Sequence, residues 1–217
     1  TYFNQSNPAG KVIIIALAFF SVCAWAVMLG KYWELKRLRL FNLGFEQSLY
    51  RLSSIIAAPA NFKAPKRVPY AALYSDAIDA YNRIEPKAGE SMEQLRSARV
   101  GHVENALQRA LANKTLSYES SMIFLATIVS GAPFFGLLGT VWGVMDAFGA
   151  VGLQASASLQ NLAPGVSGAL LTTVAGLCVA IPSVFGYNYL LSRNKVLVTE
   201  LENFASSLAD MIELESR

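Results

Sequence analysis

The chain has 217 residues, of which 53% are hydrophobic and 15% are charged, and its formal net charge is +3. Soluble globular domains carry about a quarter charged residues, so this composition argues against a soluble domain and indicates a membrane protein. Nucleic-acid binding is also disfavoured, because the 14 basic residues of segment 31–118 are interleaved with eight acidic ones and the small net charge leaves no strongly basic surface.

The first predicted element is a membrane span over residues 11–30, preceded by the polar segment 1–10. Its uncharged stretch, residues 12–30, is longer than the apolar core of a typical signal peptide, and a basic cluster follows it where a small-residue cleavage site would lie. We therefore interpret this stretch as a membrane span rather than as a cleaved leader.

Residues 31–118 form a predicted cytoplasmic helical domain. Short loops rich in Lys and Arg stay in the cytoplasm, and 14 of the 18 basic residues lie in this segment, beginning directly after the first span. The N-terminal segment is then external. Three-and-four spacing of apolar residues predicts helices here, the first of them continuous with the first span. Its apolar positions are Leu35, Leu38, Phe41, Phe45, Leu49 and Leu52.

The same domain contains a break and two further predicted helices. Segment 57–69 carries three prolines and interrupts the first helix. Helical spacing resumes over residues 70–84 and 91–120, separated by a turn-type stretch at 85–89. The second of these helices is predicted to run straight into the next membrane span.

Two more spans, residues 119–150 and 164–192, are predicted from a long stretch that is almost free of charge. Between Glu119 and Arg193 the only charged residue is Asp146, and the stretch is long enough for two crossings of about 20 residues each. A short external turn over residues 151–163 joins them. The third span returns the chain to the cytoplasm.

Residues 193–217 form a predicted cytoplasmic C-terminal helix. Alternating steps of four and three give this helix a seam like that of a coiled coil. The seam consists of Leu197, Leu201, Phe204, Leu208 and Met211. Packing on the chain's own cytoplasmic domain and packing at a subunit interface both fit this pattern.

Small residues recur on one face of each of the last two spans. On the second span they are Gly136, Gly139, Thr140, Gly143, Asp146, Ala147 and Ala150. On the third span they are Gly165, Gly168, Ala169, Thr172, Thr173, Gly176 and Ala180. Small faces let helices pack closely in membranes, and this is the favoured interpretation of the glycines. The threonines add hydroxyl groups, so the two faces could instead line a wet or partner-filled cavity.

Asp146 is the one charged side chain between Glu119 and Arg193. Intramembrane carboxylates often have functional roles, but Asp146 is predicted near the outer end of its span. An interfacial, partly hydrated carboxylate is therefore favoured over a direct role in ion uptake. The sequence carries no nucleophile with an acid and a base, no metal-ligand spacing and no phosphate-binding loop, so neither enzymatic activity nor a metal site is expected.

The segments LATIVSGAPFFGLLGTVWGVMDAF and LAPGVSGALLTTVAGLCVAIPSVFGYNYL resemble the second and third membrane helices of the ExbB/TolQ family, stator subunits of proton-driven motors related to MotA. The resemblance is close over residues 121–191. It implies an all-α subunit with three transmembrane helices in the bacterial inner membrane, its N-terminus and the 151–163 turn periplasmic and its C-terminus cytoplasmic. It also implies a homopentameric ring around an ExbD/TolR-like dimer of single-span proteins.

Several functional expectations come from this resemblance. Protons are the expected coupling ion, with sodium left open, and no cofactor is expected. The essential aspartate of such motors lies on the partner, and the family threonines fall on Thr140 and Thr173, with Thr172 beside them. The expected client is a TonB/TolA-like protein or another envelope process. One position departs from the family pattern, because Gly168 stands where well-known members carry a glutamate.

Two other functions remain open from the residues alone. A self-sufficient ion channel or transporter would show flux without a partner. A purely structural membrane scaffold would use the small faces only for assembly and would tolerate loss of the threonine hydroxyls.

Overall fold

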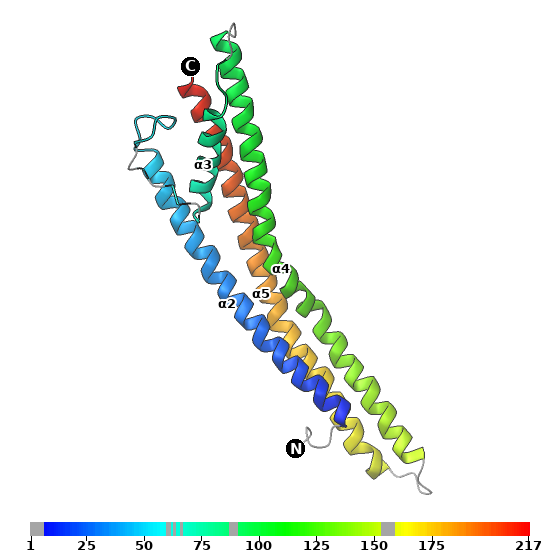
Figure 1. The fold of residues 1–217 in the computed structure, drawn as a ribbon. Helices are drawn as coiled ribbons and strands as arrows, with labels where there is room; N and C mark the ends of the chain where they lie inside the picture. Colours follow the sequence, from blue (N-terminus) through cyan, green and yellow to red (C-terminus); the bar gives the residue numbers. More distant parts are fainter. Residues whose placement is uncertain (1–6, 60–61, 63, 66, 87–90, 153–158) are drawn as a thin grey trace. The chain divides into compact units, whose positions relative to one another are not determined.

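The computed structural model describes residues 7–59, 62, 64–65, 67–86, 91–152 and 159–217, and it shows an all-α fold (Figure 1). Its helices are α2 (Pro8–Leu49), α3 (Pro69–Asn82), α4 (Met92–Gly152) and α5 (Leu159–Glu215). No strand occurs among these residues, so the predicted fold class is confirmed.

Three of the helices, α2, α4 and α5, are long and apolar enough to cross a membrane. This confirms the three spans expected from the sequence. The prediction that α4 runs without a break from the polar domain into a span is also confirmed, since α4 is one helix from Met92 to Gly152. Helix α2 likewise continues from its apolar part to Leu49.

The helix ends differ in detail from the predicted bounds. Helix α2 begins at Pro8, within the polar segment 1–10 that precedes the predicted first span. Helices α4 and α5 occupy both flanks of the expected turn 151–163, and the rest of that turn, residues 153–158, lies outside the described residues. Pro133, Pro164 and Pro182 are accommodated within α4 and α5 without ending either helix.

The chain divides into two compact units. The membrane unit comprises Thr1–Lys31 and Ser121–Leu191, and the extramembrane unit comprises Tyr32–Ser120 and Ser192–Arg217. Each long helix therefore contributes one part to each unit.

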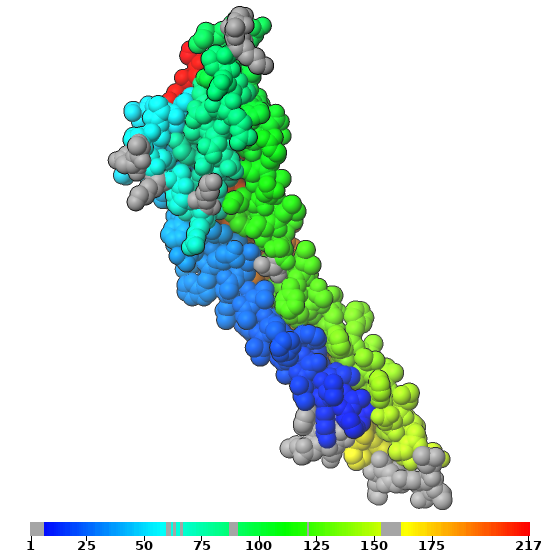
Figure 2. Space-filling view, in the orientation of Figure 1, coloured from blue at the N-terminus to red at the C-terminus, as the bar shows by residue number. Residues whose placement is uncertain are grey.

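In the membrane unit, the first part of α2 packs beside the second part of α4. The rings of Phe20 and Phe135 lie 5.5 Å apart, and Leu17 and Ala24 of α2 are fully buried or nearly so. In the space-filling view the blue atoms of α2 and the yellow-green atoms of α4 cover neighbouring parts of the visible face (Figure 2). Bulky side chains on the outer faces of α4 and α5 remain exposed, as expected for contact with lipid or other helices. They include Trp142, Met145, Phe148, Leu170, Ile181 and Phe185.

In the extramembrane unit, the apolar seam of α5 is buried within the chain's own domain. Phe204 stacks on Tyr70 of α3, with ring centroids 3.9 Å apart and planes 9° from parallel. The seam was predicted to end at Met211, but the structure buries Ile212 completely and leaves Met211 half-buried. The four earlier seam positions, Leu197, Leu201, Phe204 and Leu208, are buried as predicted.

The end of α5 is tied to the turn that follows α2. The Glu215 carboxylate accepts hydrogen bonds from the Ile55 amide at 2.7 Å, from the Ile56 amide at 3.3 Å and from the Ser54 hydroxyl. The Tyr74 hydroxyl donates to the Ile55 carbonyl at 2.8 Å. These bonds satisfy main-chain groups that would otherwise lack partners where the helix has ended.

Candidate functional site at the α4–α5 contact

The candidate site lies in the membrane unit, where α4 and α5 run in opposite directions with small residues between them. A Cβ atom added to Gly176 would lie 2.7 Å from the Ala132 carbonyl oxygen, and one added to Gly136 would lie 2.9 Å from the Thr172 carbonyl oxygen. Real Cβ atoms do not come so close to main-chain oxygens, so this approach of the two backbones requires glycine.

The remaining small residues continue this contact along both helices. The facing pairs are Gly139 with Thr172, Gly143 with Ala169, and Gly165 with Ala147. Gly168, at the position where the family resemblance leads one to expect a glutamate, is buried on α5. The structure thus brings the small faces of the two spans together within one chain.

Three threonine hydroxyls meet at the centre of this contact. The Thr140 Oγ1 atom of α4 lies 2.5 Å from Thr173 Oγ1 and 3.3 Å from Thr172 Oγ1, both on α5. The Thr172 hydroxyl also lies 2.7 Å from the Ala169 carbonyl and 2.9 Å from the Gly136 carbonyl. Because a bilayer interior offers no water to such groups, these bonds allow three hydroxyls to lie between apolar helices.

The Thr140 and Thr173 hydroxyls can satisfy their protons in two ways, since a hydroxyl donates one hydrogen bond and accepts two. In the first, Thr173 donates to Thr140, and Thr140 donates to the Ala169 carbonyl at 3.0 Å or to the Gly136 carbonyl at 3.3 Å. In the second, Thr140 donates to Thr173, and Thr173 donates to the Gly136 carbonyl at 3.3 Å. In the first arrangement the Thr173 oxygen accepts no hydrogen bond from Thr140, and in the second the Thr140 oxygen accepts none from Thr173. In each case that oxygen can accept a hydrogen bond from an incoming donor.

Access distinguishes the three threonines. Thr172 is completely buried, whereas Thr140 and Thr173 are half-buried. Thr172 is therefore placed to hold the two helices together, and Thr140 and Thr173 are the more exposed residues of the cluster.

Asp146 takes part in a different interaction from the threonines. Its Oδ2 atom accepts a hydrogen bond from Asn7 Nδ2 at 2.5 Å, and its side chain is exposed. Asn7 Oδ1 accepts from the Gly10 amide at 2.7 Å, which is the geometry of a helix N-cap. Asn7 thus links the start of α2 to Asp146 on α4. Sequence reasoning could not single out Asn7, because this residue lies in a polar segment without periodicity.

The site offers the hydroxyl and carbonyl oxygens of the threonine cluster. It also offers the Asp146 carboxylate, which accepts a hydrogen bond from the Asn7 side-chain amide. Within the described residues, no group of three or more His, Cys, Asp or Glu side chains is placed to hold a metal ion. The chemistry that the hydroxyl cluster supports is the exchange of hydrogen bonds with a polar or proton-carrying group.

These features define a class of protein, namely a multi-pass α-helical membrane protein with a hydroxyl cluster between two of its spans. Residues 81–203 match the family model described as the MotA/TolQ/ExbB proton channel family, and the chain belongs to this family. The resemblance inferred from the two membrane motifs is therefore confirmed. Family membership and the three apolar helices together make it an inner-membrane protein.

Individual relatives carry related names. The biopolymer transport protein ExbB of Xanthomonas campestris pv. campestris is 36% identical over 156 residues, covering 70% of this chain and 61% of the relative. The Tol-Pal system protein TolQ of Haemophilus influenzae is 27% identical over 220 residues, covering 99% of this chain and 93% of the relative. The chain thus spans about three fifths of the Xanthomonas protein and nearly all of the Haemophilus one.

Proposed function

We propose that this chain is the stator subunit of a motor complex driven by the proton-motive force. In this proposal it works with an ExbD/TolR-like single-span dimer and energises an envelope process through a TonB/TolA-like or other client. The observation that carries the proposal is the half-buried pair of Thr140 and Thr173 hydroxyls at the contact of two spans. Membership of a proton channel family supports it.

The proposed mechanism uses the cost of placing a charge in an apolar environment. A carboxylate on a partner helix is strongly disfavoured among apolar spans while it is ionised, and protonation removes much of that cost. The protonated group can then donate to Thr140 or Thr173, whose oxygens accept in the two arrangements described above. One charge that crosses the membrane releases about 2.3 kcal/mol per 100 mV, so mechanical work requires several protons for each stroke.

The proposed assembly is a homopentameric ring that encloses the partner helices. The exposed bulky faces of α4 and α5 would contact lipid or neighbouring copies. The charge bias of segment 31–118 supports a cytoplasmic extramembrane unit and C-terminus, with the start of α2 on the periplasmic side. Asp146 and Asn7 would then lie near the periplasmic surface.

The test is ion flux through the purified complex in liposomes under an imposed pH gradient, with and without the partner. The proposal predicts proton flux only when the partner is present. Flux from this chain alone would identify a self-sufficient channel. A complex that shows no proton flux but responds to a sodium gradient would contradict the proton assignment, and a complex inert to both gradients would favour a structural scaffold.

The same assay decides the role of Asp146. Asp146→Asn keeps an oxygen that can accept from Asn7 but removes the negative charge. If Asp146 is an interfacial residue, the variant retains flux close to that of the unmodified complex. A large loss of flux in a variant that still assembles would instead assign Asp146 to the ion pathway.

A further inference from the structure

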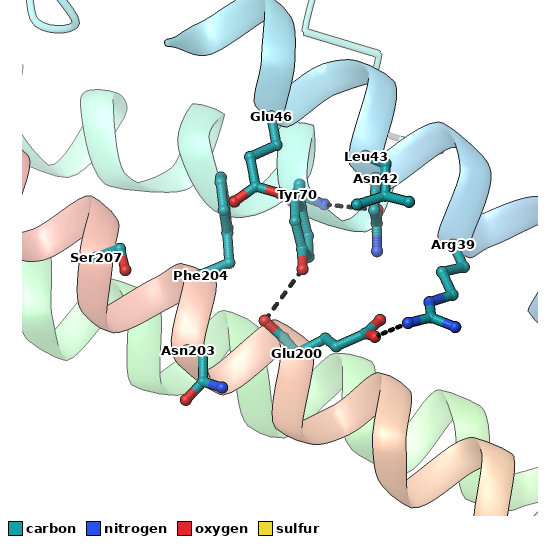
Figure 3. Close-up of a pocket in the computed structure, with 9 residues that line it drawn as sticks. All are labelled: Arg39, Asn42, Leu43, Glu46, Tyr70, Glu200, Asn203, Phe204 and Ser207. Atoms are coloured by element: carbon teal, nitrogen blue, oxygen red, sulfur yellow. Dashed lines mark hydrogen bonds and ion pairs between the residues drawn. The ribbon is translucent and has the colours of Figure 1, made fainter.

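The extramembrane unit contains a pocket of about 240 Å³ between α2, α3 and α5 (Figure 3). A water molecule occupies about 30 Å³ in the liquid, so the pocket has room for a group the size of an amino-acid side chain. It lies outside the membrane unit and has no part in the proposed motor cycle. Its lining residues are Arg39, Asn42, Leu43, Glu46, Tyr70, Glu200, Asn203, Phe204 and Ser207.

Asn42 brings an unused hydrogen-bond donor to this pocket. The residue is only 2% exposed, and its Oδ1 atom accepts from the Tyr70 main-chain amide at 3.3 Å. Because that amide can only donate, the bond fixes Oδ1 on the Tyr70 side and leaves Nδ2 to face the space between Tyr70 and Arg39 (Figure 3). Among the residues that the structure describes, Asn42 Nδ2 has no hydrogen-bond partner, and a buried donor of this kind costs free energy until an acceptor reaches it.

The charges around the pocket favour a cation. Arg39 and Glu200 form an ion pair at 2.6 Å, so they largely offset each other. Glu46 forms no ion pair within the part of the chain that the structure describes, and it leaves the pocket with one negative charge in excess. Burial, followed by the Glu46 and Glu200 carboxylates, raises the pKa of Tyr70 from 10.0 to about 12, although Arg39 lowers it in part.

The aromatic wall gives the pocket a defined shape. The Tyr70 ring stands between Phe204 and Asn42 (Figure 3), and its stacking on Phe204 holds it in place. The Tyr70 hydroxyl donates to the Glu200 carbonyl at 3.1 Å, so the side chain is held both at one ring face and at its hydroxyl. A flat cation that enters beside this ring can make contact with an aromatic face.

We propose that this pocket binds an organic cation, with a guanidinium group paired to Glu46 and a carbonyl oxygen that accepts from Asn42 Nδ2. This is the chemistry of a basic amino-acid residue, supplied either as a free small molecule or as part of a protein segment. A metal ion fits the pocket poorly, because the unsatisfied buried group is an N–H donor rather than an oxygen ligand.

The proposal is tested by calorimetric titration of the full chain, purified in detergent, with argininamide, citrullinamide and agmatine. Citrullinamide replaces the guanidinium by a neutral group, and agmatine keeps the guanidinium but lacks the carbonyl. We expect saturable binding of argininamide, binding of citrullinamide weaker by about tenfold or more, and weaker binding of agmatine. No saturable binding of argininamide, or equal binding of argininamide and citrullinamide, would overturn the proposal.

Two protein variants locate the site. Glu46→Gln removes the unpaired carboxylate and should weaken argininamide binding about tenfold or more. Glu202→Gln is the matched control, since Glu202 is exposed on α5 and does not line the pocket, and it should bind argininamide normally. Unchanged binding by Glu46→Gln, in protein with the same melting temperature as the unmodified chain, would place the cation elsewhere and refute the assignment.

A capped peptide separates the two sources of the cation. Tighter binding of acetyl-Ala-Arg-Ala-amide than of argininamide would identify a basic protein segment as the occupant. Weaker binding of the peptide would identify a free small molecule. Failure of both ligands would count against the pocket as a cation site.

Discussion

The hydroxyl oxygens of Thr140 and Thr173 lie 2.5 Å apart across the contact of α4 and α5, closer to each other than to any carbonyl that accepts from either of them. One proton therefore lies between the two oxygens, and its direction decides which carbonyl the second proton meets. Thr140 lies 3.0 Å from the Ala169 carbonyl of α5 and 3.3 Å from the Gly136 carbonyl of α4, whereas Thr173 lies 3.3 Å from the Gly136 carbonyl. When Thr140 donates to Ala169, a reversal of the pair moves a hydrogen bond from one helix to the other. The pair can thus respond to a donor that arrives beside it.

Replacing Thr140 by valine should abolish partner-dependent flux while the complex still assembles. Valine keeps the shape of threonine but removes the hydroxyl that bonds Thr173. We expect flux to fall at least about tenfold, the equivalent of one hydrogen bond to a charged or polar group. Thr140→Ser retains the hydroxyl and should keep most of the flux. The measurement is proton uptake by liposomes that contain the purified complex.

Thr127→Val is the matched control for this experiment. Thr127 lies on the same helix, is exposed, and donates to the Ile123 carbonyl of its own turn at 2.9 Å, so its hydroxyl serves only local structure. Its variant should conduct normally. Equal losses in the Thr127 and Thr140 variants, or an assembled Thr140→Val complex with full flux, would remove the hydroxyl pair from the mechanism.

Gly176→Ala should destabilise the membrane unit, because the new methyl group would meet the Ala132 carbonyl oxygen at 2.7 Å. A main-chain oxygen cannot turn aside as a side chain can, so α4 and α5 must separate at a cost of about 1–3 kcal/mol. For a chain of this length that cost lowers the melting temperature by roughly 2–4 °C per kcal/mol. The measurement is a thermal melt of the detergent-solubilised protein.

Gly149→Ala on α4 supplies the control for the packing variant. No described residue lies within 4 Å of the Cβ that it would introduce, and alanine favours a helix over glycine by about 1 kcal/mol. We expect its melting temperature to stay level or to rise. A fall in both variants would mean that the glycines matter for reasons other than the close approach of the two helices.

The fold and the faces of the spans could be predicted because each depends on local periodicity. Small residues at three-and-four spacing place Thr140 on one face of its helix and Thr173 on one face of the other, whatever lies opposite. Their pairing could not be predicted in the same way, because the register between two antiparallel helices depends on which glycine meets which backbone. Gly176 opposite Ala132 sets that register in the structure.

Two other features were beyond sequence reasoning for different physical reasons. The bond from Asn7 to Asp146 joins residues 139 positions apart, and neither belongs to a shared pattern. At the end of α5, Met211 and Ile212 lie at about equal angles on either side of the apolar seam when each residue turns the helix by about 100°. Periodicity cannot choose between them, and the structure buries Ile212.

Glu215→Ala should open the turn that follows α2 without unfolding the rest of the chain. The Glu215 carboxylate accepts from the Ile55 and Ile56 amides, and its removal leaves both without this partner. We expect these amides to exchange with deuterium about tenfold faster, which corresponds to a local loss of about 1.4 kcal/mol. Hydrogen exchange followed by mass spectrometry measures this directly. Glu202→Ala, an exposed change on the same helix, should leave the exchange of these amides unchanged.

Alkaline pH should destabilise the extramembrane unit through Tyr70, which is 5% exposed. Burial, followed by the Glu46 and Glu200 carboxylates, raises the pKa of the Tyr70 phenol from 10.0 to about 12. The folded protein therefore keeps the proton to a higher pH than the unfolded chain does. The contribution of Tyr70 to stability is complete below pH 10 and is lost as the pH rises through about 12.

Melting temperatures measured between pH 9 and pH 12 check this expectation. Tyr70→Phe cannot ionise, so its melting temperature should fall less steeply above pH 10 than that of the unmodified protein. A part of the fall should remain, because burial also raises the pKa of Tyr74. The control is Tyr32→Phe, which alters an exposed phenol that is not among the groups acting on Tyr70 and should leave the slope unchanged. If the melting temperature of Tyr70→Phe falls with pH as steeply as that of the unmodified protein, the Tyr70 proton does not stabilise the fold. The excess negative charge assigned to the pocket would then lose one of its supports.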